Sequence, residues 1–157
     1  MGNFNEAAVN AVFGAIESYA MQSGRFDKVN THEPKSGPGT GVLCAIWIQA
    51  IKPIRASGLA ATSGLVVVQS RIYMDFLAQP YDVIDPKITA AVADLMGAIS
   101  ADFEFGEVAN VRNVDLLGST GTSLAAQAGY VEIDRQIYRV MTVTIPVIIN
   151  DMFMQVA

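Results

Sequence analysis

The chain has 157 residues and a net charge of −5, with 52% apolar and only 16% charged residues. Such an acidic chain is excluded as a protein that coats nucleic acid, because neutralising phosphates requires clustered lysine and arginine. No stretch approaches the ~20 uninterrupted apolar residues that a membrane-spanning helix needs, so the apolar surplus is expected to lie against partner subunits.

The cysteine content and the N-terminus indicate the compartment. Cys44 is the only cysteine, which excludes an intrachain disulfide and a thiolate metal cluster and fits assembly in a reducing cytoplasm. The N-terminus lacks the basic region and apolar core of a secretory signal. The length fits one domain, residues 1–157, without an internal repeat.

The first half of the chain predicts a helix followed by a pair of strands. Apolar residues at helical spacing indicate an amphipathic helix over residues 5–23, with Asn5 as its N-cap. A short strand is expected at 26–30 and an open loop at 32–41, which is rich in Pro and Gly. Residues 42–51 are apolar on both faces, as in a central strand.

A flexible tip and an alternating strand are expected next. Residues 55–64 are small and predict a flexible tip, and the alternation over 65–74 predicts an antiparallel strand. Asp85-Pro86 then marks a helix start, because Asp is a favoured N-cap and Pro a favoured first helical residue. That helix is expected to end near Ser100.

The last third predicts mostly strands. A strand is expected at 111–116, a flexible Gly/Ser/Thr loop at 117–128, and a hairpin in which 129–133 and 136–147 flank the turn Asp134-Arg135. Helices separated by consecutive strands predict an α+β domain, with two α-helices packed on a mostly antiparallel β-sheet.

No catalytic or cofactor-binding constellation is visible. His32 is the only histidine, and its Pro/Gly-rich loop is typical of a surface histidine. The glycine-rich stretches 37–41 and 118–122 lack the Lys-Ser or Lys-Thr of a phosphate loop. Asp102, Glu104 and Glu107 are interleaved with phenylalanines, which indicates an exposed acidic edge. We therefore expect no enzyme activity, no cofactor and no metal.

The chain end is unusually apolar. Chain ends are commonly polar and loose, whereas residues 150–157 contain Met152, Phe153 and Met154. Methionine and aromatic residues are enriched at interfaces, which predicts that this tail docks on a neighbouring subunit. The flexible loops, with Leu59, Thr62 and Leu117, are the other predicted contacts.

In its order of elements the chain resembles the tail terminator proteins of siphophages, particularly those that infect actinobacteria. An N-terminal amphipathic helix leads to a Trp-containing strand, a flexible tip, a second strand and the Asp85-Pro86 helix start. The stretches that contribute most are VNTHEP at 29–34, SGLAATSG at 57–64, RIYMDF at 71–76, NVDLLG at 113–118 and YRVMTVTIP at 138–146. The resemblance spans nearly the whole chain.

This resemblance implies a structural virion protein that forms a homohexameric ring at the head–tail junction. In that family the ring caps the tail tube, stops its polymerisation and joins the tail to head-completion proteins. Genomic DNA passes through the lumen without specific binding, and the virion is assembled in the bacterial cytoplasm. No membrane partner is expected, since no apolar stretch is long enough to span a bilayer.

Three alternatives remain open at this point. The chain could be another head–tail connector or a tail tube protein of the same assembly. From a different class, it could be a small hydrolase that uses His32 with nearby carboxylates. It could also be a small-molecule binding module with an apolar pocket.

Overall fold

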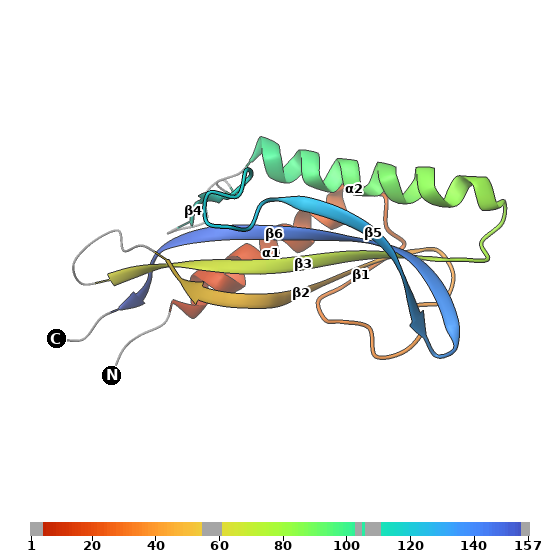
Figure 1. The fold of residues 1–157 in the computed structure, drawn as a ribbon, viewed down its shortest axis with the longest axis horizontal. Helices are drawn as coiled ribbons and strands as arrows, with labels where there is room; N and C mark the ends of the chain where they lie inside the picture. The colour runs from red at the N-terminus through yellow and green to blue at the C-terminus, as the bar shows by residue number, and fades with distance from the viewer. Residues whose placement is uncertain (1–4, 55–60, 103–104, 106–110, 155–157) are drawn as a thin grey trace.

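The fold is a six-stranded sheet with two helices on one face (Figure 1). The computed structural model describes residues 5–54, 61–102, 105 and 111–154. In chain order the elements are α1 (Glu6–Gln22), β1 (Lys28–Asn30), β2 (Val42–Pro53), β3 (Ala61–Asp75), a 3₁₀ turn (Tyr81–Val83), α2 (Ile84–Ala101), β4 (Val111–Val114), β5 (Ala125–Ile133) and β6 (Gln136–Met154). The prediction of a mostly antiparallel α+β domain is confirmed.

The long strands β2, β3 and β6 form the antiparallel centre of the sheet. The strand order is β1-β2-β3-β6-β4, and β5 also pairs with β6. Because β6 is 19 residues long, β4 and β5 both pair with its outer side, at different levels. Figure 1 shows β5 and β6 bending together towards their hairpin end.

The main core lies between the sheet and the two helices. Val12 and Ile16 of α1 and Leu95 and Ile99 of α2 are fully buried there, against alternate residues of the central strands. Helical spacing places these pairs on one face of each helix, as the sequence predicts.

The opposite face of the sheet, which we call the helix-free face, carries two smaller apolar clusters. One is centred on Tyr73 and Tyr138, and the loop before β2 lies over it, since the Gly39 amide is 3.4 Å from the Tyr138 hydroxyl. The other contains Leu65 and Ile148. The prediction that residues 42–51 form a strand covered on both faces is confirmed for residues 42–46, which are buried. It is wrong for residues 48–51, which are exposed because β1 is too short to cover the second half of β2.

The predicted first helix and hairpin turn are confirmed. The Asn5 Oδ1 accepts a hydrogen bond from the Ala8 amide at 3.2 Å, so Asn5 is the N-cap of α1. Asp134 and Arg135 have φ values of 53° and 65°. Positive φ at both central residues is the pattern of a type I′ hairpin turn, here formed without glycine.

The predicted N-cap of the second helix is wrong by two residues. Val83 occupies the N-cap position, and Asp85 lies in the first turn of α2. The preceding 3₁₀ turn already has helical dihedrals, so the helix continues from it and does not begin at Asp85. In the first turn the Asp85 carboxylate still faces the positive end of the helix dipole.

Three predicted irregular segments are shorter than expected. Residues 61–64 of the predicted tip belong to β3, residues 125–128 belong to β5, and residues 150–154 of the predicted tail belong to β6. These segments pair with neighbouring strands. The hydrogen bonds of the sheet outweigh the low strand preference of their small and polar residues. Asp151, with φ 52°, lies where the β3–β6 register shifts, so the ladder bends there but continues.

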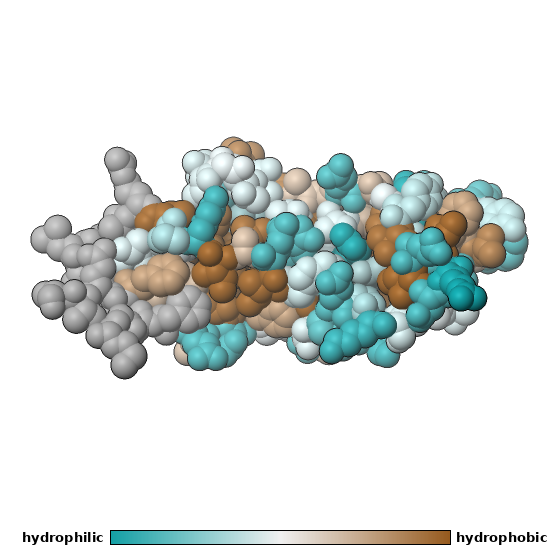
Figure 2. Space-filling view, turned by 60° about the horizontal axis from the view of Figure 1, so that its bottom comes forward, coloured by the Kyte–Doolittle hydropathy of each residue, from teal (hydrophilic) through white to brown (hydrophobic). Residues whose placement is uncertain are grey.

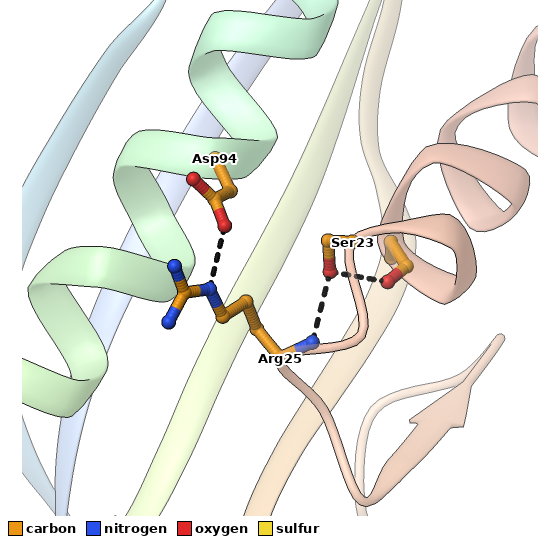
Figure 3. Close-up of polar contacts among 4 residues, drawn as sticks. Ser23, Arg25 and Asp94 are labelled. Atoms are coloured by element: carbon orange, nitrogen blue, oxygen red, sulfur yellow. Dashed lines mark hydrogen bonds and ion pairs between the residues drawn. The ribbon is translucent and has the colours of Figure 1, made fainter.

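An ion pair joins the segment after α1 to α2 (Figure 3). The Arg25 Nε lies 2.6 Å from the Asp94 Oδ2, and Ser23 Oγ accepts a hydrogen bond from the Arg25 amide at 3.2 Å. Ser23 Oγ also donates to the Ala20 carbonyl at 2.7 Å, which ends the helix. Both charged side chains are about half exposed, at 50% and 43%.

Replacing Arg25 with Ala is expected to lower the free energy of unfolding by at most about 1 kcal/mol, because water screens exposed ion pairs. Urea unfolding followed by circular dichroism measures the change, with Arg25→Lys as the control that keeps the charge. A loss of several kcal/mol would contradict this minor role.

Candidate interaction surfaces

One edge of the sheet is open along the second half of β2. β1 pairs with β2 at residues 43–45, and no other described strand pairs with its outer side. A register shift between Ile48 and Ala50 lets Ile48 and Ile51 share the helix-side face, opposite the core residues Val68 and Val66. Ile48 and Ile51 are nevertheless 38% and 42% exposed. This stretch, residues 47–51, is called the β2 edge.

The other edge of the sheet is formed by β5. Its first four residues, Ala125 to Ala128, are exposed, and the strand carries no charge before Glu132. Within the described part of the chain, β5 pairs with β6 alone. Proteins normally protect open edges with charges or proline, and Lys52 and Pro53 at the end of β2 are such residues. Residues 47–51 of β2 and 125–131 of β5 carry no charge and no proline, so these stretches are the ones left open to a partner.

The loop between β4 and β5 is held by one buried carboxylate. Asp115 is 3% exposed and accepts hydrogen bonds from the amides of Gly118 (3.1 Å), Ser119 (2.9 Å) and Thr120 (2.8 Å). The hydroxyls of Ser119 and Thr120 also donate to it. Burial raises the pKa of Asp115, but the hydrogen bonds from Thr120 and Ser119 together outweigh burial and lower the pKa overall. The loop is therefore built around an ionised carboxylate.

Leu117 lies in this loop and is 95% exposed. Its neighbour Leu116 packs against the main core, and Asp115 anchors the residues that follow. The backbone on both sides of Leu117 is thus fixed while its side chain is displayed to solvent. A fixed, exposed leucine is typical of an anchor for a partner, because little conformational freedom remains to be lost on binding.

A third surface, which we call the end patch, lies where β3, the β5–β6 hairpin and the start of α2 meet. Phe76 and Tyr130 contact each other edge to face at 5.7 Å between ring centroids, and the Arg139 Cζ lies 4.6 Å from the Tyr130 centroid. The Arg139 Nε is 3.0 Å from the Asp85 Oδ1. These residues, with Leu77, Tyr81 and Ile84, line a cavity of about 400 Å³.

The end patch is open to solvent and combines aromatic and aliphatic side chains with the Arg139–Asp85 ion pair. Leu77 is 63% exposed, and Tyr81 and Tyr130 are each 60% exposed. Figure 2 shows two hydrophobic areas on one side of the molecule, separated by polar residues. Sequence reasoning missed this patch, because its members come from three separate segments with no shared motif. The run Phe76-Leu77 directly after a strand is the one local signal.

The predicted contact residues have different positions. Leu117 is fully displayed, whereas Leu59 lies outside the described residues. Thr62 is half-buried in β3, opposite Phe153, which packs partly against the core. Met154 ends β6.

The prediction that Met152 contacts a neighbouring subunit is corrected by its position. Its side chain is 0% exposed and lies in the main core of its own chain. Methionine is common both in cores and at interfaces, and the side chain of Met152 lies against Gly64 of β3, which is distant in sequence.

The residues considered for chemistry do not come together. His32 is exposed, with its Nδ1 3.1 Å from the Glu33 carbonyl oxygen. Among the described residues no group of three His, Cys, Asp or Glu side chains is placed to hold a metal. Glu104 and Glu107 lie outside the described residues. Asp102 accepts a hydrogen bond from the Tyr19 hydroxyl at 2.5 Å.

Two perturbed pKa values have structural causes. Burial, followed by the hydrogen bond and charge of Asp102, raises the pKa of Tyr19 to about 12. Burial raises the pKa of Cys44 to about 11, although its contact with Ser70 lowers it in part. A thiol with such a pKa is protonated at neutral pH and is a poor nucleophile.

No family model matches the chain, and no curated protein sequence matches it. In the described part of the chain, no helix is long and apolar enough to cross a membrane. The fold and its surfaces define the class as a two-layer α+β domain with open sheet edges and exposed aromatic residues at one end.

Proposed function

We propose that this chain is the tail terminator of a long-tailed bacteriophage, a structural subunit whose ring caps the tail tube. The observation that carries the proposal is the pair of open edge stretches without charged residues, 47–51 of β2 and 125–131 of β5, at opposite sides of one sheet. A contact between unlike surfaces of identical subunits generates a ring when the rotation closes. The order of elements described above supports the same assignment.

The end patch supports a second contact in this function. Most of it follows the end of β3 and surrounds the start of α2, away from the open first half of β5, and only Tyr130 belongs to that edge strand. A ring that stops tube growth must bind a different ring on at least one face. Exposed tyrosine, phenylalanine and leucine around a hollow are typical of such a binding surface. We assign the end patch to contact with the tail tube or the head-completion protein.

The charge of the chain fits the passage of DNA. A net charge of −5 gives no general attraction to phosphates. Genomic DNA therefore passes through the proposed lumen without being held.

The test is assembly with the tail tube protein encoded in the same genome. Light scattering and negative-stain imaging of the purified chain should give closed rings, or subunits that form rings on tube ends and stop tube growth. Long tubes formed by the chain alone would favour a tail tube protein. A compact monomer that ignores growing tubes would overturn the proposal.

Replacing Leu77 with Asp in the end patch is expected to leave rings intact and to reduce tube capping at least tenfold, because a charge then faces the apolar contact. Tube length distributions measured by imaging give the capping efficiency. The matched control is Met21→Asp, since Met21 is similarly exposed at 58% on α1, outside the patch. Equal capping by both variants would show that the end patch does not contact the tail tube. If Leu77→Asp then impaired joining to the head, the end patch would be assigned to the contact with the head-completion protein.

A further inference from the structure

We infer that the helix-free face of the sheet carries a carboxylate-binding site centred on Arg71. This site goes beyond the proposed function and does not rest on it. It is a hollow of about 310 Å³ between side chains of β3, β5 and β6. Its polar lining residues are Gln69, Arg71, Gln127, Thr142 and Thr144.

Strand pairing brings these five side chains to one face of the sheet. Arg71 pairs with Thr142, which pairs on its other side with Gln127. Two residues away along the strands, Gln69 pairs with Thr144. Paired residues, and residues two apart in one strand, point to the same face. The five side chains therefore form a polar band between the two apolar clusters of the helix-free face.

The Arg71 side chain is held in place before any ligand arrives. Its Nε donates to the Thr142 Oγ1 at 2.9 Å, and its Cζ lies 5.5 Å from the centroid of the Trp47 ring. Burial raises the pKa of Tyr73, and the charge and hydrogen bond of Arg71 lower it in part, so the guanidinium also contacts that hydroxyl. A half-buried side chain with these three contacts loses little conformational freedom on binding.

The Arg71 guanidinium has no carboxylate partner. None of the ion pairs among the described residues involves it, and the residues that line the hollow include no Asp or Glu. The exposed Glu33 acts on Tyr73 through its charge but lies beyond ion-pair distance of Arg71. A guanidinium has five N–H donors, of which the contacts with Thr142 and Tyr73 use two. Since no buried side-chain nitrogen of the described residues lacks a partner, the other donors of Arg71 are open to solvent and to a ligand.

The remaining groups of the hollow are also donors. The Thr142 hydroxyl accepts from Arg71 and keeps its own hydrogen to donate, and the Thr144 hydroxyl and the amides of Gln69 and Gln127 can donate as well. A hollow with one cation and several donors selects an anion, and the guanidinium fork matches the two oxygens of a carboxylate.

The charge of the site favours a carboxylate over a phosphate. Phosphates are commonly held by the amides of a helix N-terminus, and both helices lie on the other face of the sheet. A single guanidinium balances the single charge of a carboxylate. The carboxylate belongs either to a free small acid or to an acidic side chain of a protein, and the volume of the hollow is at the lower end for small-ligand sites.

An NMR titration of the full chain with sodium acetate tests the site, with sodium chloride at equal ionic strength as the blank. Trp47 gives the single indole N–H signal, and its ring lies against Arg71. Acetate should shift this signal and the Arg71 Nε–H signal along one saturable curve. The dissociation constant is expected on the order of 10 mM, because one charge-assisted pair acts in a hollow open to water.

The variants separate the hollow from arginines in general. Arg71→Gln should weaken acetate binding at least tenfold. Arg135→Gln is the matched control, because it removes the same charge from an exposed arginine in the hairpin turn, and it should leave the affinity unchanged. Arg71→Lys keeps the charge but loses the fork, so its affinity should lie between those of wild type and Arg71→Gln. Circular dichroism checks that each variant keeps the fold.

A shift that does not saturate up to about 100 mM acetate would overturn the inference. Equal weakening by Arg71→Gln and Arg135→Gln, or tighter binding of inorganic phosphate than of acetate, would also overturn it. Titration with the blocked peptide Gly-Glu-Gly identifies the carrier. Binding tighter than that of acetate, and absent with Gly-Gln-Gly, would indicate an acidic side chain of a protein. Acetate binding without peptide binding would indicate a free small acid, and both results support the carboxylate site.

Discussion

Replacing Met152 with Ala is expected to lower the free energy of unfolding by roughly 3 kcal/mol, because large-to-small changes in a packed core lose transfer energy and leave a cavity. Met152 is fully buried in the core between the sheet and the helices. Urea unfolding followed through the fluorescence of Trp47, the single tryptophan, measures the change.

The control is Met21→Ala, which removes the same atoms from a side chain that is 58% exposed. Its effect should stay within about 0.5 kcal/mol. If Met152→Ala left the free energy of unfolding unchanged but weakened the oligomers, Met152 would be a residue of the subunit interface and not of the core.

Substitutions at Gly64 test the packing of the Met152 side chain independently. A Cβ at Gly64 would collide with the Met152 Sδ, so Gly64→Ala alone is expected to destabilise the chain by about 1–3 kcal/mol through overpacking. In the double variant Gly64→Ala/Met152→Ala the new methyl group occupies the space that Met152 vacates. The loss should therefore be smaller than the sum of the two single losses, and strict additivity would contradict the packing described here.

Replacing Asp115 with Ala is expected to lower the free energy of unfolding by roughly 3 kcal/mol, because several buried donors lose a charged acceptor at once. The amides of Gly118, Ser119 and Thr120 all bond to this carboxylate. Asp94→Ala is the control, because that carboxylate makes one exposed ion pair and its loss should stay below about 1 kcal/mol. Equal effects of the two changes would show that the loop does not depend on Asp115.

The contribution of Asp115 to the free energy of unfolding should also depend on pH. Its folded pKa lies below the ordinary value of 3.8, so folding favours the ionised form. The associated stability is present above the unfolded pKa and is lost as pH falls below 3.8 towards the folded pKa. In acid titrations the stability difference between wild type and Asp115→Asn should be constant near neutral pH and shrink at the acid end. A difference that grows in acid would contradict an ionised Asp115.

Hydrophobic periodicity predicted the buried residues correctly where a helix or strand buries only one of its faces in the main core. The stripe Val12 and Ile16 and the alternation of Val66 and Val68 both predict the face that packs against the core. Asn5 and the turn Asp134-Arg135 were also predictable, because caps and tight turns depend on a few adjacent residues.

The surfaces were harder to predict. Leu117 was predicted as a contact residue, but its rigid support was not, since the Asp115 carboxylate turns a Gly/Ser/Thr stretch into an ordered loop. The end patch joins Phe76, Tyr81 and Tyr130 from separate segments. The burial of Met152 could not be predicted, because it depends on Gly64 in a strand that is distant in sequence.

The sequence by itself determined the α+β class, the positions of both helices and the three long strands, because hydrophobic periodicity is a local property that each segment carries alone. The tertiary structure decided which strands lie at the edges, how far β3, β5 and β6 extend, and which apolar residues stay exposed. These features depend on pairing between distant segments, whose hydrogen bonds and burial outweigh local preference.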